Sequence, residues 1–261
     1  MKMMVRDNRK TFGYYSLALI HKENKLQEFL GAVYKEEHDN TPALWTFIQA
    51  LYFEIADLMY SRGDDLQSIK AIVEKGLEVQ SIKMYHYRKR KKSLQDARKE
   101  EKIDNYPEFK RAFSSSAAFQ HYYNILQILS RSIIFDVDKN VFQKYAEDVT
   151  IPGADFIFDY FIHSFDMDWP VNGKLNYPKK MESLYQASNA GIVDEIESNL
   201  TEYTLSWLTK LRGHPLFGSH MMKDYNYTGY WCFEAAAMAK LKRIDTPSFL
   251  GLRYFPNEII N

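Results

Sequence analysis

The sequence YNYTGYWCFEAAAM, residues 225–238, predicts an apolar helix at the centre of the fold. Thr228 is a residue type that caps helices, and Gly229 after it leaves the entering backbone free to bend. At helical spacing, apolar side chains then cover nearly every side of the element. The three alanines at 235–237 allow a neighbouring helix to approach closely. We therefore expect a helix that is surrounded by other helices.

Glu234 is the one charged residue of this apolar segment. A carboxylate that is buried without a partner costs several kcal/mol or takes up a proton, so Glu234 needs a partner. The sequence offers a backbone amide in the preceding loop or one of four side chains: Arg212, His214, His220 and Arg253. Two interpretations stay open, a structural carboxylate that anchors the loop to the core, and a general acid or metal ligand.

Composition predicts a globular protein with no overall charge. The chain has 261 residues, 46% of them hydrophobic, and 34 basic side chains balance 34 acidic ones. The acids are concentrated in residues 136–202, which hold 13 acidic and 5 basic side chains. The lone Cys232 excludes an intrachain disulfide and suits a reducing compartment. The apolar run at 14–20 is too short for a signal peptide or a membrane span, so we expect a cytoplasmic protein without a membrane contact.

Helical periodicity and start signals run through the whole chain. The Thr41-Pro42 pair is typical of a helix start, Arg62-Gly63 of a helix end, and Pro178 of a further start. No stretch alternates as a strand does, so the predicted fold class is all-α, a bundle-like array of many helices. The expected helices cover residues 8–38, 41–62, 65–102, 107–135, 138–147, 155–166, 178–190 and 191–211, with short helices after 229 and at 247. We expect two packed modules, residues 1–135 and 136–261.

The acidic region contains three aspartates that a helix would place together. Asp155, Asp159 and Asp166 are four and seven residues apart, and Ile162 shares their face. A face with an apolar centre and an acidic rim is typical of an interface. The hypothetical partner-binding residues are Asp155, Asp159, Asp166, Asp168, Glu182, Asp194, Glu195 and Glu197.

Other residues allow alternative functions. The basic run Arg88–Lys92 could bind the phosphates of a nucleic acid, although such a run at a helix end is usually solvated. An enzyme would use Glu234, His220 and His163, and would need a pocket where they converge. His163 and Asp166 could also ligate a metal, but no HExxH or CxxC motif supports a metal site. We expect no catalytic residue, no metal and no cofactor.

The C-terminal segment GYWCFEAAAMAKLKRID, together with RYFP at 253–256, resembles the signature of the PoNi family of immunity proteins. The signature residues here are Trp207, His220, Gly229, Tyr230, Trp231, Phe233 and Glu234. The segment LYFEIADLMYSRGDDLQSIKAIVEKGLE resembles the N-terminal half of the family. Leu208 and Phe255 depart from the pattern, which has an aromatic residue at the first position and a tyrosine at the second.

The resemblance implies an all-helical protein without enzymatic activity. Members of the family neutralise PoNe-type DNases, polymorphic toxins that bacteria use in competition and deliver by type VI secretion. The implied partner is therefore a cognate DNase toxin, bound in the cytoplasm with its active site occluded. An acidic surface fits this partner, because a DNase presents a basic cleft to DNA. Direct binding of nucleic acid is not expected, and a homodimer stays open.

Overall fold

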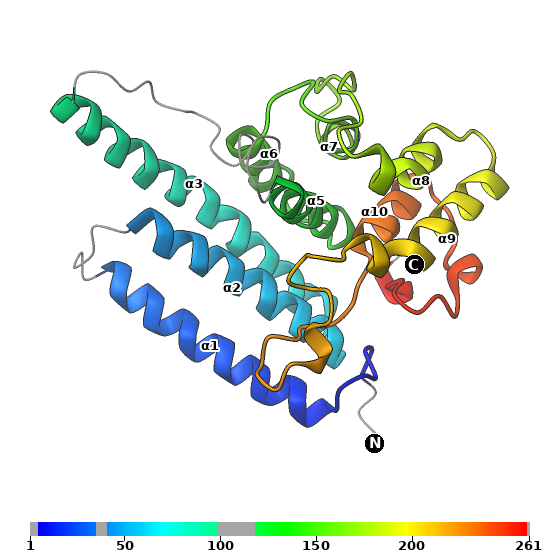
Figure 1. Cartoon of the computed structure of the whole chain (residues 1–261), viewed down its shortest axis with the longest axis horizontal. Coiled ribbons are helices and arrows are strands. Elements are labelled where there is room, and N and C mark those ends of the chain that lie inside the picture. Colours follow the sequence, from blue (N-terminus) through cyan, green and yellow to red (C-terminus); the bar gives the residue numbers. More distant parts are fainter. Residues whose placement is uncertain (1–4, 35–40, 99–117, 260–261) are drawn as a thin grey trace. The chain divides into compact units, whose positions relative to one another are not determined.

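A computed structural model of the chain describes residues 5–34, 41–98 and 118–259 (Figure 1). Within these residues the regular structure consists of nine α-helices and three short 3₁₀ helices, with no β-strand. The predicted all-α fold class is confirmed. No helix in the described ranges is long and apolar enough to cross a membrane.

The chain forms two compact units, and each is built from separate segments. Unit 1 contains Met1–Pro107, Val137–Val149 and Met222–Gly229, and unit 2 contains Glu108–Asp136, Thr150–Met221 and Tyr230–Asn261. The segment 222–229 therefore belongs to unit 1, although the residues on either side of it belong to unit 2. The sequence boundary at residue 136 stays a prediction.

Unit 1 is a layer of antiparallel helices with a fourth helix packed on it. Figure 1 shows α1 (Phe12–Tyr34), α2 (Thr41–Arg62) and α3 (Leu66–Arg98) side by side, and α6 (Lys139–Val149) packs against α3. Two local signals, of which the sequence predicted the first, lie between α2 and α3. Gly63 leaves α2 with a φ of 102°, and the Asp65 carboxylate accepts a hydrogen bond of 2.9 Å from the Ser68 amide. Residues 99–102, the expected end of the third helix, lie outside the described residues.

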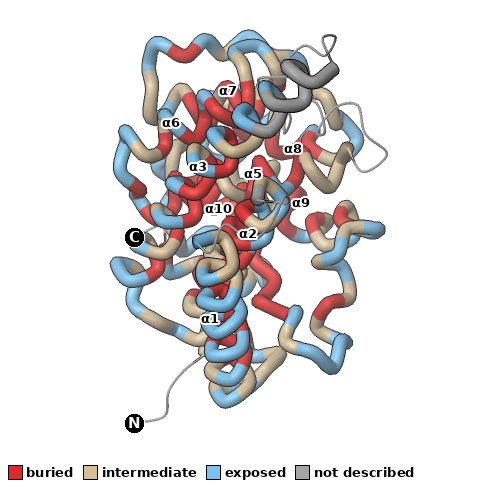
Figure 2. The backbone as a smooth tube through the Cα atoms, turned by 90° about the vertical axis from the view of Figure 1, so that its left-hand side faces the viewer, coloured by how far each residue is buried: buried red, intermediate tan, exposed pale blue. Residues whose placement is uncertain are grey.

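Unit 2 is arranged around α10 (Phe233–Leu241), as the alanine-rich segment predicted. This helix packs against α5 (Ala118–Ile134), α8 (Pro178–Asn189) and α9 (Val193–Lys210). Every residue from Phe233 to Ala239 is buried, and Figure 2 shows α10 in the buried colour. The remaining elements are α7 (Phe156–His163), η1 (Ser219–Met221), η2 (Thr246–Phe249) and η3 (Asn257–Ile259). Pro107, the expected start of the fourth helix, lies outside the described residues.

The predicted helix cap at Thr228 is wrong. The helix begins only at Phe233, and residues 227–232 have no regular structure. The Thr228 carbonyl instead accepts a hydrogen bond of 2.6 Å from the Ser61 hydroxyl within unit 1. Gly229 follows with a φ of 122°, a conformation that side chains rarely adopt. The bend at Gly229 was expected, but it leads into a segment without regular structure rather than into a helix.

Candidate functional site

Glu234 lies in the first turn of α10 and is completely buried. Its Oε1 accepts hydrogen bonds from the Tyr123 hydroxyl at 3.0 Å, the Tyr203 hydroxyl at 2.9 Å and the Trp207 indole at 2.7 Å. Its Oε2 accepts one from the Gln127 amide. Burial raises the pKa of Glu234, while the hydrogen bonds from tyrosine and tryptophan oppose that rise. The carboxylate joins α10 to α5 and α9.

The four side chains that the sequence offered as partners of Glu234 do not include these donors. Among the described contacts, the polar donors to its carboxylate are neutral side chains that lie 27 to 111 residues earlier in the chain. Only Trp207 was singled out from the sequence, as part of the family signature. A spacing rule within one helix could not find the others, because they come from α5 and from the buried side of α9. The structure supports the interpretation of Glu234 as a satisfied, structural carboxylate.

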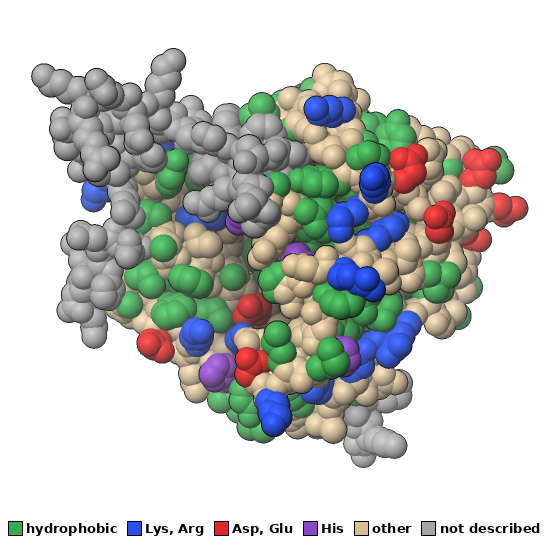
Figure 3. Space-filling view, viewed as in Figure 1, with side chains coloured by type: hydrophobic (Ala, Val, Ile, Leu, Met, Phe, Trp, Pro, Cys, Tyr) green, Lys and Arg blue, Asp and Glu red, His purple; other side chains and the backbone are tan. Residues whose placement is uncertain are grey.

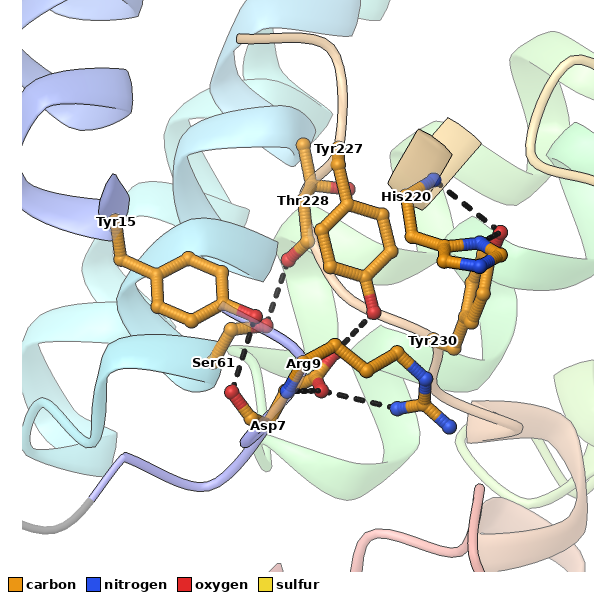
Figure 4. A network of polar contacts seen from close by, with 8 residues as sticks. All are labelled: Asp7, Arg9, Tyr15, Ser61, His220, Tyr227, Thr228 and Tyr230. Atoms are coloured by element: carbon orange, nitrogen blue, oxygen red, sulfur yellow. Dashed lines mark hydrogen bonds and ion pairs between the residues drawn. The ribbon is translucent and has the colours of Figure 1, made fainter. Parts of the chain in front are cut away.

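Two further signature residues pack next to this centre in unit 2. The Tyr230 ring contacts the Trp207 ring at a centroid distance of 6.4 Å, and the His220 ring at 5.3 Å. The His220 Nδ1 lies 2.7 Å from the Tyr230 hydroxyl, as Figure 4 shows. Tyr230, Trp231 and Phe233 are buried. The buried signature residues of unit 2 are therefore part of its core, and the half-buried His220 packs against them.

Asp155 caps the N-terminus of α7 and is completely buried. Its carboxylate accepts hydrogen bonds from the Ile157 amide at 3.0 Å, the Tyr122 hydroxyl at 3.1 Å, and the backbone and side-chain amides of Asn176, each at 3.1 Å. Burial raises the pKa of Asp155, and these bonds oppose the rise. The residue fixes both the start of α7 and the end of the loop before α8.

Asp159 is also completely buried, one turn further along α7. It accepts hydrogen bonds from the Trp169 indole at 3.0 Å, the Gly173 amide at 2.9 Å and the Gly153 amide at 3.2 Å. A Cβ atom on Gly173 would stand 2.8 Å from the Asp159 carboxylate and 2.6 Å from the backbone carbon of Asp155. The backbone at Gly173 is therefore held against both carboxylates.

The placement of Asp155 and Asp159 on an acidic surface is wrong. Asp155 precedes α7, and α7 ends at His163, so Asp166 lies in the turn beyond the helix. Ile162, expected on the same surface, is buried as well. The prediction assumed that the helix continues as far as Asp166, whereas it ends at His163. The two buried aspartates instead hold the loop that carries Asp166 and Asp168.

The remaining predicted acidic residues reach the surface of unit 2. Asp168, Glu182, Asp194 and Glu195 are exposed, and Asp166 and Glu197 are partly exposed. Figure 3 shows acidic side chains gathered over α8 and α9. Glu197 accepts a hydrogen bond from the Ser248 hydroxyl. We refer to Asp166, Asp168, Glu182, Asp194, Glu195 and Glu197 as the exposed carboxylates.

A polar network in unit 1 was not found from the sequence. The buried Asp7 accepts hydrogen bonds from the Tyr227 hydroxyl and, at 2.9 Å, from the Arg9 guanidinium. The Tyr15 hydroxyl donates to the Asp7 carbonyl at 3.1 Å (Figure 4). The network ties the N-terminal segment to residues 222–229. No local motif marks it, because Asp7 and Tyr227 are 220 residues apart.

The residues of the alternative functions do not form a site in the described parts of the chain. Arg88 lies 3.4 Å from Asp148, Lys89 and Lys92 are exposed, and the side chains of residues 90 and 91 are outside the description. His163 donates through Nδ1 to the Trp169 carbonyl at 2.8 Å, which occupies one of its two ring nitrogens. No group of three His, Cys, Asp or Glu side chains in the described residues could hold a metal ion.

Comparison with family models covers nearly the whole chain. The model described as the N-terminal part of PoNe immunity proteins (PoNi) matches residues 12–147, and the model of their C-terminal part matches residues 153–259. The chain belongs to the PoNi family. The C-terminal PoNi match contains Asp155, Asp159 and Glu234, the three buried carboxylates of unit 2 described above.

A solved structure has the same fold as this PoNi chain. Protein PA2201 from Pseudomonas aeruginosa matches with a TM-score of 0.73 and 13% sequence identity, over 100% of this chain and 90% of that chain. At this identity the likeness concerns the fold alone. A search of curated proteins found no match.

Proposed function

We propose that this chain is an immunity protein that binds a cognate PoNe-type DNase toxin and neutralises it by occluding its active site or its DNA-binding cleft. The observation that carries the proposal is the match of both PoNi models, over residues 12–147 and 153–259. Inhibition would take place in the cytoplasm and would require binding alone. Glu234 serves the scaffold in this proposal and takes part in no catalysis.

The exposed carboxylates are proposed to contribute to the toxin contact. A nuclease attracts DNA with a positive cleft, and an acidic surface would be steered to the same cleft and could occupy the positions of the phosphates. Asp194 and Glu195 stand in the first turn of α9, where the helix dipole also favours them. Asp155 and Asp159 would act indirectly, by holding the loop that carries Asp166 and Asp168.

The test uses the nuclease domain of a PoNe-type toxin, and the reading frame next to that of this chain is the first place to look for it. Copurification of the two proteins, together with loss of DNA cleavage at equimolar immunity protein, is the expected result. The double charge reversal Asp194→Lys and Glu195→Lys should weaken binding and reduce its dependence on salt, because two attractive charges become repulsive. Wild-type protein that neither binds the nuclease nor inhibits it would refute the proposed function.

A further inference from the structure

A second exposed region of unit 2 combines basic and apolar side chains. It lies at the end of α9 and in the loop that follows, where Phe217 is 39% exposed and Met221 is 74% exposed. Figure 3 shows Lys and Arg side chains gathered near the end of α9. We call Lys180, Lys210, Arg212, Phe217 and Met221 the α9-loop surface.

Direct contacts join the basic members of this surface. The Lys180 ammonium donates a hydrogen bond to the Lys210 carbonyl at the end of α9, and it lies 4.0 Å above the Phe119 ring. The Lys210 ammonium lies 4.8 Å above the Tyr203 ring. Both lysines are therefore held over aromatic rings, which orders them more than free surface lysines.

The loop after α9 supplies the apolar members. The Arg212 guanidinium lies 6.0 Å from the centre of the Phe217 ring. Gly218, next to Phe217, has a φ of 80°, and a Cβ atom on it would stand 3.4 Å from the terminal carbon of Met221. The arginine, the aromatic ring and the methionine thus follow one another along a short, turned segment.

The cations of this surface form no close ion pair within the described protein. No acidic side chain of residues 5–34, 41–98 or 118–259 lies at ion-pair distance from Lys180, Lys210 or Arg212. The Glu202 carboxylate acts on the Lys210 ammonium only from beyond that distance. Burial lowers the pKa of both lysines, because part of their hydration has been lost. A carboxylate from outside would restore a counter-charge to lysines that are already partly desolvated.

His214 adds no charge to this region near neutral pH. Its Nδ1 accepts a hydrogen bond of 3.1 Å from the Leu216 amide, so in the neutral ring the hydrogen is on Nε2, which faces the Asn124 side chain at 3.4 Å. Burial and the neighbouring Lys180 lower the pKa of His214 to about 4. The charge of the α9-loop surface therefore comes from its two lysines and its arginine.

We propose that the α9-loop surface is a second contact with the toxin, and that it docks on a carboxylate-bearing face of the nuclease. The inference rests on the proposed function. Arginine, aromatic residues and methionine are enriched in the centres of protein interfaces. Phe217 and Met221 give apolar area that a phosphate backbone would not use, which favours a protein over DNA as the occupant.

The test measures the dissociation constant for the same nuclease domain with two variants, Arg212→Glu and Phe217→Ala. Both side chains are exposed, so folding should be retained and is checked by circular dichroism. Lys144→Glu, an exposed cation of α6 in unit 1, is the matched control for charge. Leu205→Ala, 66% exposed on α9, is the matched control for apolar area.

We expect R212E and F217A each to weaken binding by at least about tenfold, and the two controls to change it less than about threefold. Wild-type binding that R212E and F217A leave unchanged would overturn this inference while the proposed function stands. Absence of wild-type binding would refute the proposed function and the surface with it. Binding of a DNA duplex that R212E abolishes would also overturn the inference, because the surface would then serve nucleic acid.

Discussion

Removal of the Glu234 carboxylate tests whether this group is the structural centre of unit 2. In Glu234→Ala, the donors from Tyr123, Tyr203, Trp207 and Gln127 lose their shared acceptor inside the core. An unsatisfied buried donor costs about 1–3 kcal/mol, but the four share two oxygen atoms and their costs do not add. We expect a loss of about 3–5 kcal/mol of unfolding free energy, from the donors left without an acceptor and from the cavity that the shorter side chain leaves. That loss is a large part of the total stability of a domain.

The assay is urea unfolding followed by circular dichroism. Amide hydrogen exchange in α5, α9 and α10 reports on unit 2 separately. Glu234→Gln is the matched control, because it keeps the volume and one acceptor oxygen, and it should cost about 1–2 kcal/mol. A loss below about 1 kcal/mol in E234A would refute the structural role of this carboxylate.

The dependence on pH gives an independent check. Because burial raises the folded-state pKa of Glu234 above its usual 4.5, the folded protein holds this proton more tightly than the unfolded chain does. The stability that comes from this proton is fully present when the pH is below the pKa of Glu234 in the unfolded chain. It is lost as the pH rises through the pKa of Glu234 in the folded protein. Wild-type protein should therefore lose stability relative to E234Q as the pH rises above about 4.5. A difference that moves in the opposite direction would show that the hydrogen bonds outweigh burial.

Three further changes test other parts of the structure. Gly173→Ala should cost about 2–3 kcal/mol in thermal unfolding, because its Cβ atom would stand 2.6 Å from the backbone of Asp155; a wild-type melting temperature would contradict this contact. Tyr227→Phe removes a donor to the buried Asp7 and should cost about 1–3 kcal/mol, with faster hydrogen exchange in α1 but not in α10 as the distinguishing result. The Cys232 thiol is buried and burial raises its pKa, so its alkylation in the folded protein should be much slower than in urea; equal rates would mean that this part of the core opens readily.

Helix starts and ends could be predicted because their signals are local. Thr41-Pro42 and Pro178 stand where α2 and α8 begin, and Gly63 follows the last residue of α2. Each of these signals acts within a few residues, through a fixed φ angle or a missing donor. Thr228 carries the same type of signal, but its carbonyl is engaged by Ser61, 167 residues away. A tertiary contact therefore overrode the local preference at that position.

The candidate site was harder to predict, because burial depends on partners that are distant in sequence. Asp155 and Asp159 look like surface residues in a region rich in acids, yet glycine and asparagine amides and a tryptophan indole surround them. Nothing in a charge count separates a solvated aspartate from one that accepts several hydrogen bonds. The glycine at 173 was a usable signal, since it permits the close approach that those hydrogen bonds require.

The three buried carboxylates of unit 2 are stabilised in the same way, and this affects which substitutions the unit can accept. Asp155, Asp159 and Glu234 are each stabilised by neutral N–H and O–H donors, so each is favourable only while its whole set of donors is present. Substitutions at the donors should therefore be costly. Exposed residues such as Asp194 and Arg212 carry no such constraint, and changes there usually alter stability by less than about 0.5 kcal/mol. A scaffold of this kind can keep its fold while its exposed charges are exchanged, as the proposed contact with different toxins would require.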